Sequence, residues 1–343
     1  MKAEYATLIN RKPALPEGLA KLVWPVAALT LLLVFNAIFT PGFFRVEFRD
    51  GYLYGSLIDI LNHGSKVMLL ALGMTLVIAT GGVDLSVGAV MAVSGAIAVE
   101  MVQDPTASLA AAVAAALSVS VLAGAWNGAL VSLLRIQPII ATLILMVAGR
   151  GVAQLITKGF IPITQHEGFT FIGNGKFLAL PFPVTIVAIM VLLTWAATRK
   201  TAIGLFIESV GDNEKASHFA GINARTVKFV VYTFSGFCAG LAGLVAASNI
   251  KAADSNNAGL FLELDAIIAV VVGGTALTGG RFNLPGAIIG SLLIQTLTTT
   301  LYMRNVNPFV IPVYKAVVVL AVCLIQSPVF RAQLAAPFRR AAA

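Results

Sequence analysis

Long apolar runs separated by short polar segments dominate the pattern along this chain. Each run approaches the roughly 20 helical residues that cross a hydrocarbon core of about 30 Å. Backbone amides in lipid must bond within their own segment, so such runs predict helices, and the sequence lacks the alternating segments of an outer-membrane barrel. About ten spans are predicted, at residues 22–39, 64–80, 84–102, 107–134, 137–156, 181–197, 227–250, 262–278, 284–303 and 308–326. The pattern indicates an all-α, polytopic membrane protein with a single transmembrane domain over residues 1–343.

Composition supports this class and excludes others. Hydrophobic residues make up 58% of the chain, charged residues 11%, and the mean hydropathy is +0.92, outside the range of soluble domains. The net charge of +8 comes from Lys and Arg scattered along loop ends, so nucleic acid is not an expected partner. The three histidines have no Cys, Asp or Glu at metal-ligand spacing, so neither a metal nor a cofactor is expected.

The distribution of basic residues predicts the orientation. With ten spans and an inner amino terminus, fourteen of the 23 Lys and Arg residues fall in inner segments and eight in outer segments or span ends. Because cytoplasmic loops retain Lys and Arg, we expect a cytoplasmic amino-terminal tail (1–21), a cytoplasmic loop at 199–228 and a cytoplasmic carboxyl-terminal tail (328–343). The remaining basic residue, Arg150, lies inside a span, where it either reaches toward the outer headgroups or lines a polar cavity.

Two glycine-rich breaks interrupt the apolar pattern. The first, at residues 80–88, carries Asp84, which either caps the following helix or lines a solute path. The second, at residues 273–283, follows a helix that contains Asp265. Alignment of Val83-Asp84 and its helix with Leu264-Asp265 and its helix puts the spans after residues 57 and 227 in corresponding order but opposite membrane direction, which predicts an inverted internal repeat. Glycine pairs at spacing four, such as Gly124 and Gly128, favour close packing within the chain over a dimer seam.

The hydrophilic stretch at residues 199–228 is the feature best suited to touch a soluble partner. Within it a short helix is predicted from about Glu214, with Asn213 or Asp212 as its cap and Gly221 as its stop. The side of this helix that bears Ala216, Phe219 and Ala220 is apolar and fits a groove on a partner. The sequence has no Gly-x-x-x-x-Gly-Lys-Ser/Thr phosphate loop and no Gly-x-Ser-x-Gly nucleophile motif, so neither ATP hydrolysis nor an intramembrane hydrolase is expected of this chain.

These segments resemble a known family. The 204–223 segment looks like the coupling loop of the permease subunits of bacterial ATP-binding-cassette sugar importers, the branch with the ribose, xylose and autoinducer-2 permeases. The run Gly-Gly-Val-Asp-Leu-Ser-Val-Gly at 81–88 is similar to that family's signature Gly-Gly-Ile-Asp-Leu-Ser-Val-Gly and differs from it only at Val83. Residues 264–280 match a later signature of the same family. Within the family, residues 136–151 and 256–265 look most like the galactofuranose permeases.

The resemblance implies a transport subunit, not an enzyme, in the bacterial inner membrane. It would carry a monosaccharide, expected to be galactofuranose, from a periplasmic sugar-binding protein across the lipid bilayer. A separate ATPase subunit and a second permease subunit, identical or related, would complete the importer. The residues expected to couple to the ATPase are Glu208, Gly211, Asp212, Asn213, Glu214, Lys215, Ala216, Gly221 and Ile222. The residues expected in the substrate path or gate are Asp84, Ser86, Asn127, Gln137 and Asp265.

Two other interpretations stay open at this point. A proton-driven secondary transporter of a small polar solute would use Asp84 and Asp265 as a titrating pair and would need no ATPase. A receptor or scaffold without transport activity is favoured only by the hydrophilic loop. The long outer segment at 158–180 has no assigned role, although docking of the binding protein would suit it.

Overall fold

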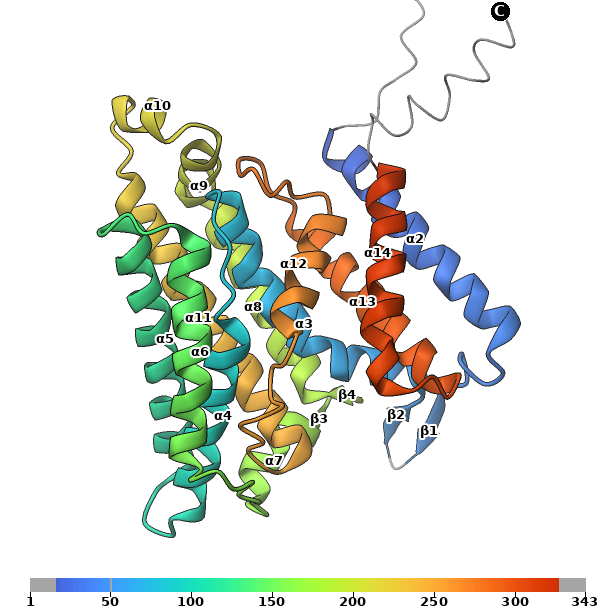
Figure 1. The fold of residues 1–343 in the computed structure, drawn as a ribbon. Helices are drawn as coiled ribbons and strands as arrows, with labels where there is room; N and C mark the ends of the chain where they lie inside the picture. Colours follow the sequence, from blue (N-terminus) through green and yellow to red (C-terminus); the bar gives the residue numbers. More distant parts are fainter. Residues whose placement is uncertain (1–16, 50, 327–343) are drawn as a thin grey trace, which may run out of the picture.

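The computed structural model describes residues 17–49 and 51–326, and its regular structure is almost entirely helical (Figure 1). The helices are α2 (Glu17–Phe39), α3 (Ser56–Ala79), α4 (Val87–Gln103), α5 (Leu109–Ser132), α6 (Pro138–Ile156), α7 (Glu167–Asn174), α8 (Phe182–Lys200), α9 (Ile203–Asp212), α10 (Glu214–Phe219), α11 (Ala224–Ile250), α12 (Leu262–Val272), α13 (Leu284–Met303) and α14 (Ile311–Gln326). A 3-10 turn, Pro308–Val310, precedes α14. Strands β1 (Glu47–Arg49) and β2 (Tyr52–Tyr54) pair antiparallel, as do β3 (Lys176–Phe177) and β4 (Leu180–Pro181).

The all-α, polytopic prediction is confirmed. In the described ranges, seven helices are long and apolar enough to cross a membrane: α2, α3, α5, α6, α8, α11 and α13. Helices α4, α12 and α14 are shorter. The predicted span 262–278 is wrong as one helix, because α12 ends at Val272 and the paired glycines Gly273 and Gly274 follow, the second at φ +93°. Eleven residues of helix extend only about 16 Å, roughly half of the hydrocarbon thickness.

Helix α3 forms the centre of the bundle. Every residue at 67–79 is buried, and the helix packs against α8, α11, α12 and α13. Its mostly apolar second half is therefore surrounded by protein on all sides, as a central helix in a polytopic protein requires. Movement at either end of α3 must be accommodated by these four neighbours.

Glycine pairs bring α5 and α11 into backbone contact. A Cβ atom placed on Gly124 would lie 2.5 Å from the Tyr232 carbonyl oxygen, and one on Gly236 would lie 2.4 Å from the Ser120 carbonyl oxygen. Both distances are shorter than any ordinary carbon–oxygen contact, so only glycine fits. The expected packing of small residues within the chain is confirmed for this pair of helices.

The two ends of the bundle differ in character. Helices α9 and α10 project at one end, together with the start of α2 and the finish of α14, and we call this the α10 end (Figure 1). Both β-hairpins and α7 lie at the opposite end, here the hairpin end (Figure 1). Helix α2 begins at Glu17, inside the predicted tail 1–21, while residues 1–16 and the predicted tail 328–343 lie outside the described residues.

Candidate functional site

Helix α9 is fixed to the bundle by its apolar side and by one glycine. Ile207 and Val210 are 1% and 2% exposed. A Cβ atom on Gly211 would lie 1.7 Å from the carbonyl oxygen of Ala79, the last residue of α3, and 2.5 Å from the Gly280 nitrogen. The Gly280 amide in turn donates a hydrogen bond of 2.9 Å to that same carbonyl. The last turn of α9 therefore rests directly on the backbone at the end of α3.

Helix α10 confirms the short helix predicted in the hydrophilic stretch. The Asn213 side-chain oxygen accepts a hydrogen bond from the Ala216 amide (3.0 Å), which caps the helix. Gly221 follows at φ +83° and ends the segment. The predicted apolar side is turned outward, and Phe219 is 90% exposed. An exposed aromatic ring at the tip of a projecting helix suits contact with another protein.

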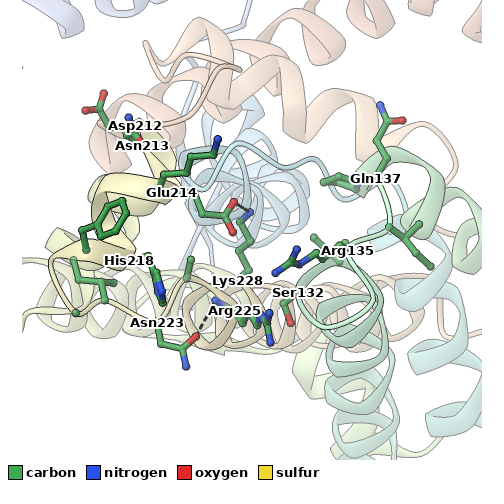
Figure 2. A pocket seen from close by; sticks show the side chains of 18 residues that line it. Ser132, Arg135, Gln137, Asp212, Asn213, Glu214, His218, Asn223, Arg225 and Lys228 are labelled. Atoms are coloured by element: carbon green, nitrogen blue, oxygen red, sulfur yellow. Dashed lines mark hydrogen bonds and ion pairs between the residues drawn. The ribbon is translucent and has the colours of Figure 1, made fainter.

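A groove lies between α10 and the turn that joins α5 to α6 (Figure 2). Its volume is about 1200 Å³. In Figure 2, Arg135 and Gln137 border it from the α5–α6 turn, and Glu214 and His218 border it from α10. The charged residues that line it are Arg135, Asp212, Glu214, Lys215, Arg225 and Lys228. Four positive side chains against two negative ones make this a predominantly basic recess.

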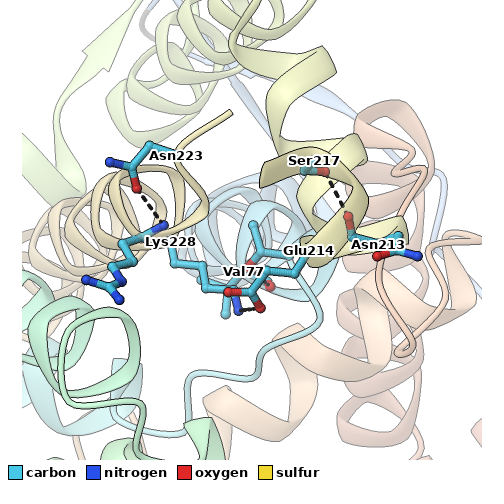
Figure 3. Close-up of polar contacts among 8 residues, drawn as sticks. Val77, Asn213, Glu214, Ser217, Asn223 and Lys228 are labelled. Atoms are coloured by element: carbon cyan, nitrogen blue, oxygen red, sulfur yellow. Dashed lines mark hydrogen bonds and ion pairs between the residues drawn. The ribbon is translucent and has the colours of Figure 1, made fainter. Parts of the chain in front are cut away.

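One ion pair crosses from α10 to α11 at this groove (Figure 3). The Lys228 ammonium lies 2.7 Å from the Glu214 carboxylate, with side-chain exposures of 20% and 54%. The neighbouring Ser217 hydroxyl donates to the Asn213 carbonyl oxygen (2.9 Å), which holds the first turn of α10 (Figure 3). A pair this exposed contributes about 1 kcal/mol or less, so it orients α10 more than it stabilises the fold.

Most of the predicted coupling residues gather here. Those that line the groove are Asp212, Asn213, Glu214, Lys215, Gly221 and Ile222. Gly211 instead contacts the end of α3, Ala216 is exposed on α10, and Glu208 is partly buried on α9. One predicted path residue, Gln137, also lines the groove and so sits beside the coupling residues.

Three other predicted path residues meet in the interior. The Asp84 carboxylate accepts hydrogen bonds from the Ser86 amide (3.0 Å), the Ser86 hydroxyl (2.6 Å) and the Ser235 hydroxyl of α11 (2.8 Å). Asn127 of α5 donates to the Ser86 hydroxyl oxygen (2.8 Å). Asp84 is 1% exposed and Asn127 is fully buried. The carboxylate therefore bonds the amide just before α4, not one in its first turn, and it ties the α3–α4 break to α5 and α11.

Asp265 lies in a different set of contacts. Its carboxylate pairs with the Lys315 ammonium of α14 at 2.7 Å, and the two side chains are 9% and 16% exposed. Asp84 and Asp265 share no partner among the contacts of the described residues. In the same residues, no group of three or more His, Cys, Asp and Glu side chains is arranged to hold a metal ion.

Comparison with known proteins decides the family. The sequence pattern of the family described as "Branched-chain amino acid transport system / permease component" matches residues 56–326. The chain is also 50% identical to the galactofuranose transporter permease protein YtfT of Escherichia coli (strain K12), over 94% of both chains. The chain belongs to this permease family. No solved structure matches the permease.

Other relatives of the permease are also named as sugar permeases. It is 40% identical to the fructose import permease protein FruF of Bifidobacterium longum (strain NCC 2705), over 90% of this chain and 88% of that one. It is 37% identical to the ribose import permease protein RbsC of Escherichia coli (strain K12), over 88% and 92% of the two chains. The predicted resemblance to sugar permeases is thereby confirmed.

Arg150 of the permease has backbone partners that the sequence did not predict, while its reach toward the headgroups or its lining of a polar cavity stays a prediction. Its guanidinium donates hydrogen bonds to the carbonyl oxygens of Ser255 (3.1 Å) and Ala258 (2.5 Å), in the loop between α11 and α12. The Ser255 hydroxyl also bonds the Ala153 carbonyl oxygen (3.0 Å) and the Thr157 hydroxyl (3.0 Å) of α6 and its end. Arg150 thus holds irregular backbone against α6, six residues before that helix ends.

Replacing Arg150 with methionine is expected to loosen this loop. Hydrogen bonds to charged groups contribute about 1.5–3 kcal/mol, and both carbonyl oxygens would lose their donor. Thermal unfolding of the purified protein should shift to lower temperature, and a protease should cut the 251–261 loop faster than in the parent protein. Arg135→Met, at an exposed arginine with no role in this loop, is the matched control and should leave both measurements unchanged.

Several groove residues escaped prediction. Arg135, His218, Asn223, Arg225 and Lys228 line it with the predicted set. Their proximity depends on the fold, because the α5–α6 turn and the start of α11 are about ninety residues apart in the sequence. Helix α9 was also missed, although Ile203, Ile207 and Val210 recur at helical spacing and indicate a helix with one apolar side.

Proposed function

We propose that this permease is the membrane subunit of an ATP-driven importer that carries a monosaccharide, galactofuranose, across the bacterial inner membrane. ATP hydrolysis takes place on a separate ATPase subunit docked at the α10 end, which faces the cytoplasm together with both termini. A periplasmic sugar-binding protein delivers the sugar at the hairpin end. A second permease subunit, identical or related, completes the path. The 50% identity to a galactofuranose permease over nearly the whole chain supports the choice of sugar.

One observation carries this proposal: the direct backbone contact of Gly211 with the end of α3. A force applied to α9 and α10 by a closing ATPase reaches the Ala79 carbonyl without an intervening flexible side chain. From there it acts on α3 and on the α3–α4 break, which Asp84 ties to α5 and α11. Such a rigid connection is what conversion of ATPase closure into helix movement requires.

The decisive test is transport by the complete importer. The permease, its ATPase and its binding protein are reconstituted in vesicles with internal ATP, and uptake of radiolabelled galactofuranose is compared with that of ribose and fructose. We expect saturable galactofuranose uptake that stops when the ATPase is inactivated and persists when a protonophore removes the proton gradient. Uptake that survives loss of the ATPase and collapses with the protonophore would instead establish proton-coupled transport.

Replacing Ala216 with glutamate tests the docking surface alone. Ala216 is exposed on α10, so the substitution should leave folding and membrane insertion intact. A larger, charged side chain at a fitted contact lowers affinity by about tenfold or more, because it must be accommodated and desolvated. Copurification of the ATPase with the tagged permease should fall accordingly.

The control is Thr106→Glu, at an exposed position on the hairpin end, which should copurify the ATPase normally. Normal copurification with Ala216→Glu would place the ATPase contact elsewhere.

A further inference from the structure

Helix α3 carries a strip of polar residues on its half nearest the hairpin end. Asn62 and His63 each lie three or four residues from both Asp59 and Lys66, so the four residues share one side of the helix. Asp59 and His63 are exposed, and Lys66 is partly buried. Ten residues separate Ser56 from Lys66, which places this ammonium about 15 Å along the helix from its first residue. Ionisable groups at this depth avoid lipid and face protein or water.

The strip ends at a cavity of about 360 Å³. Lys66 lines it from α3, and the loop between α11 and α12 contributes Asp254 and Asn257. The rest of the wall is apolar and comes from α4, α11, the loop and the start of α12, with Met91, Ile250, Leu260 and Leu262 as its larger side chains. A few polar groups set in a mainly apolar wall are typical of small-molecule sites, and this volume is near the lower limit for such sites.

The polar groups of the cavity are only partly used within the protein. Asp254 accepts hydrogen bonds from the amides of Asn256 and Asn257 and from the Asn257 side chain (2.8 Å). Lys66, by contrast, has neither a hydrogen bond nor an ion pair among the described residues. One turn away on the strip, the side-chain oxygen of Asn62 is buried and also lacks a partner. An uncompensated ammonium this far along an apolar helix needs water or a ligand as its partner.

The loop that closes the cavity is held in place at depth. Arg150 bonds the carbonyl oxygens of Ser255 and Ala258, and helix α12 begins directly after the loop and is too short to cross the membrane. Irregular backbone next to a half-length helix occurs at membrane depth only where it is buried in protein or lines a water-filled cavity. The position of the loop is thus set independently of Lys66.

We propose that this cavity, reached along the Asp59–Lys66 strip, is a subsite at which the sugar contacts the permease after it leaves the binding protein. The inference rests on the proposed function, because it takes the hairpin end to be periplasmic. Lys66 donates hydrogen bonds to sugar oxygens, Asp254 and Asn257 accept them from hydroxyls, and the apolar wall packs against ring carbons. One ammonium facing one carboxylate matches a neutral polyhydroxylated ligand, and the volume suits one sugar ring.

Substitution of Lys66 in the complete importer tests the subsite. In Lys66→Met the stem of the side chain is kept and the donor removed, so uptake of galactofuranose at subsaturating concentration should fall about tenfold. Stimulation of the ATPase by the loaded binding protein should remain, because docking and coupling are untouched. Lys251→Met, at an exposed lysine beside the same loop but outside the cavity, is the matched control and should transport normally. Uptake by Lys66→Met equal to that of the parent protein would overturn the proposal.

Thiol labelling gives a second measurement that does not depend on transport. In a chain with Cys238→Ala and Cys323→Ala, the variants His63→Cys and Lys66→Cys should react with a membrane-impermeant thiol reagent added at the hairpin end. Addition of galactofuranose with its binding protein should slow labelling of Lys66→Cys. Leu69→Cys, at a position with no exposure, should not react. Absence of labelling at both strip positions would also overturn the subsite.

Failure of the proposed function and failure of the subsite alone give different results. If the proposed function is wrong, the parent importer shows neither ATP-dependent uptake nor stimulation by the binding protein. If only the subsite is wrong, the parent importer shows both, and Lys66→Met behaves like it.

Discussion

Gly211→Ala should nearly abolish sugar uptake while the protein still inserts into the membrane. The added Cβ atom would lie 1.7 Å from the Ala79 carbonyl oxygen, which belongs to buried backbone that cannot turn aside. Helix α9 must therefore move away from the end of α3. Overpacking of this kind costs about 1–3 kcal/mol, which lowers the population of the coupled arrangement roughly 10- to 100-fold. The measurement is initial uptake in vesicles, together with ATPase activity with and without the loaded binding protein.

In Gly211→Ala, ATP hydrolysis should no longer be coupled to sugar transport. Basal ATPase activity should remain, and its stimulation by the binding protein should be lost. Gly151→Ala is the matched control, because a Cβ atom there meets no atom within 4 Å and the position is in a helix. That variant should transport like the parent protein. If Gly211→Ala transported equally well, the path from α9 to α3 would not carry the coupling.

The contrast between these two glycines shows what a sequence can and cannot predict. Gly151 lies in an apolar span and Gly211 in the hydrophilic stretch, but neither setting shows which atoms a Cβ would meet. Gly211 is critical in the structure only because the ends of α9, α3 and the 273–283 loop converge on it. Such convergence involves segments about seventy to two hundred residues apart, so periodicity along the chain does not reveal it.

Features that depend only on neighbouring residues in the chain, such as the ends of a helix, could be predicted from the sequence. The cap of α10 at Asn213 and its stop at Gly221 follow from residue types alone, since only their own backbone neighbours are involved. The apolar runs likewise predicted the helical class. The length of the apolar run gave a wrong prediction at 262–278, because the paired glycines after Val272 end the helix and an irregular loop follows, with residues 276–278 exposed. The inverted repeat and the roles of the path residues stay predictions.

Arg150 illustrates a third case. The sequence marks it as a cation inside a span and leaves its partner open, because the partner is a set of backbone carbonyls on a distant loop. Backbone acceptors carry no sequence signal. The cavity near Lys66 was not anticipated because its walls come from α3, α4, α11 and the loop before α12, which only the fold brings together, although the spacing of the polar strip on α3 is visible in the sequence.

Asp84→Ala is expected to be the most destabilising single substitution among the predicted path residues. It leaves the Ser86 amide, the Ser86 hydroxyl and the Ser235 hydroxyl without their acceptor in a site that is 1% exposed. Each buried donor left unpaired costs about 1–3 kcal/mol, so the total loss amounts to several kcal/mol. Thermal unfolding of the purified protein should shift strongly to lower temperature, and uptake should be lost with it. Asp104→Ala, at an exposed carboxylate, should change neither.

Asp84→Asn separates the structural role of this carboxylate from a role in proton transfer. The amide keeps one acceptor oxygen for the Ser86 amide and hydroxyl, and its NH2 group can donate to the Ser235 oxygen, so most of the hydrogen bonds survive without the charge. We therefore expect a small loss of stability, about 1–2 kcal/mol, and substantial ATP-dependent uptake. A variant that folds with near-normal stability and yet fails to transport would show that the charge itself is needed. That result would favour a titrating Asp84 over a carboxylate that fastens the α3–α4 break to α5 and α11.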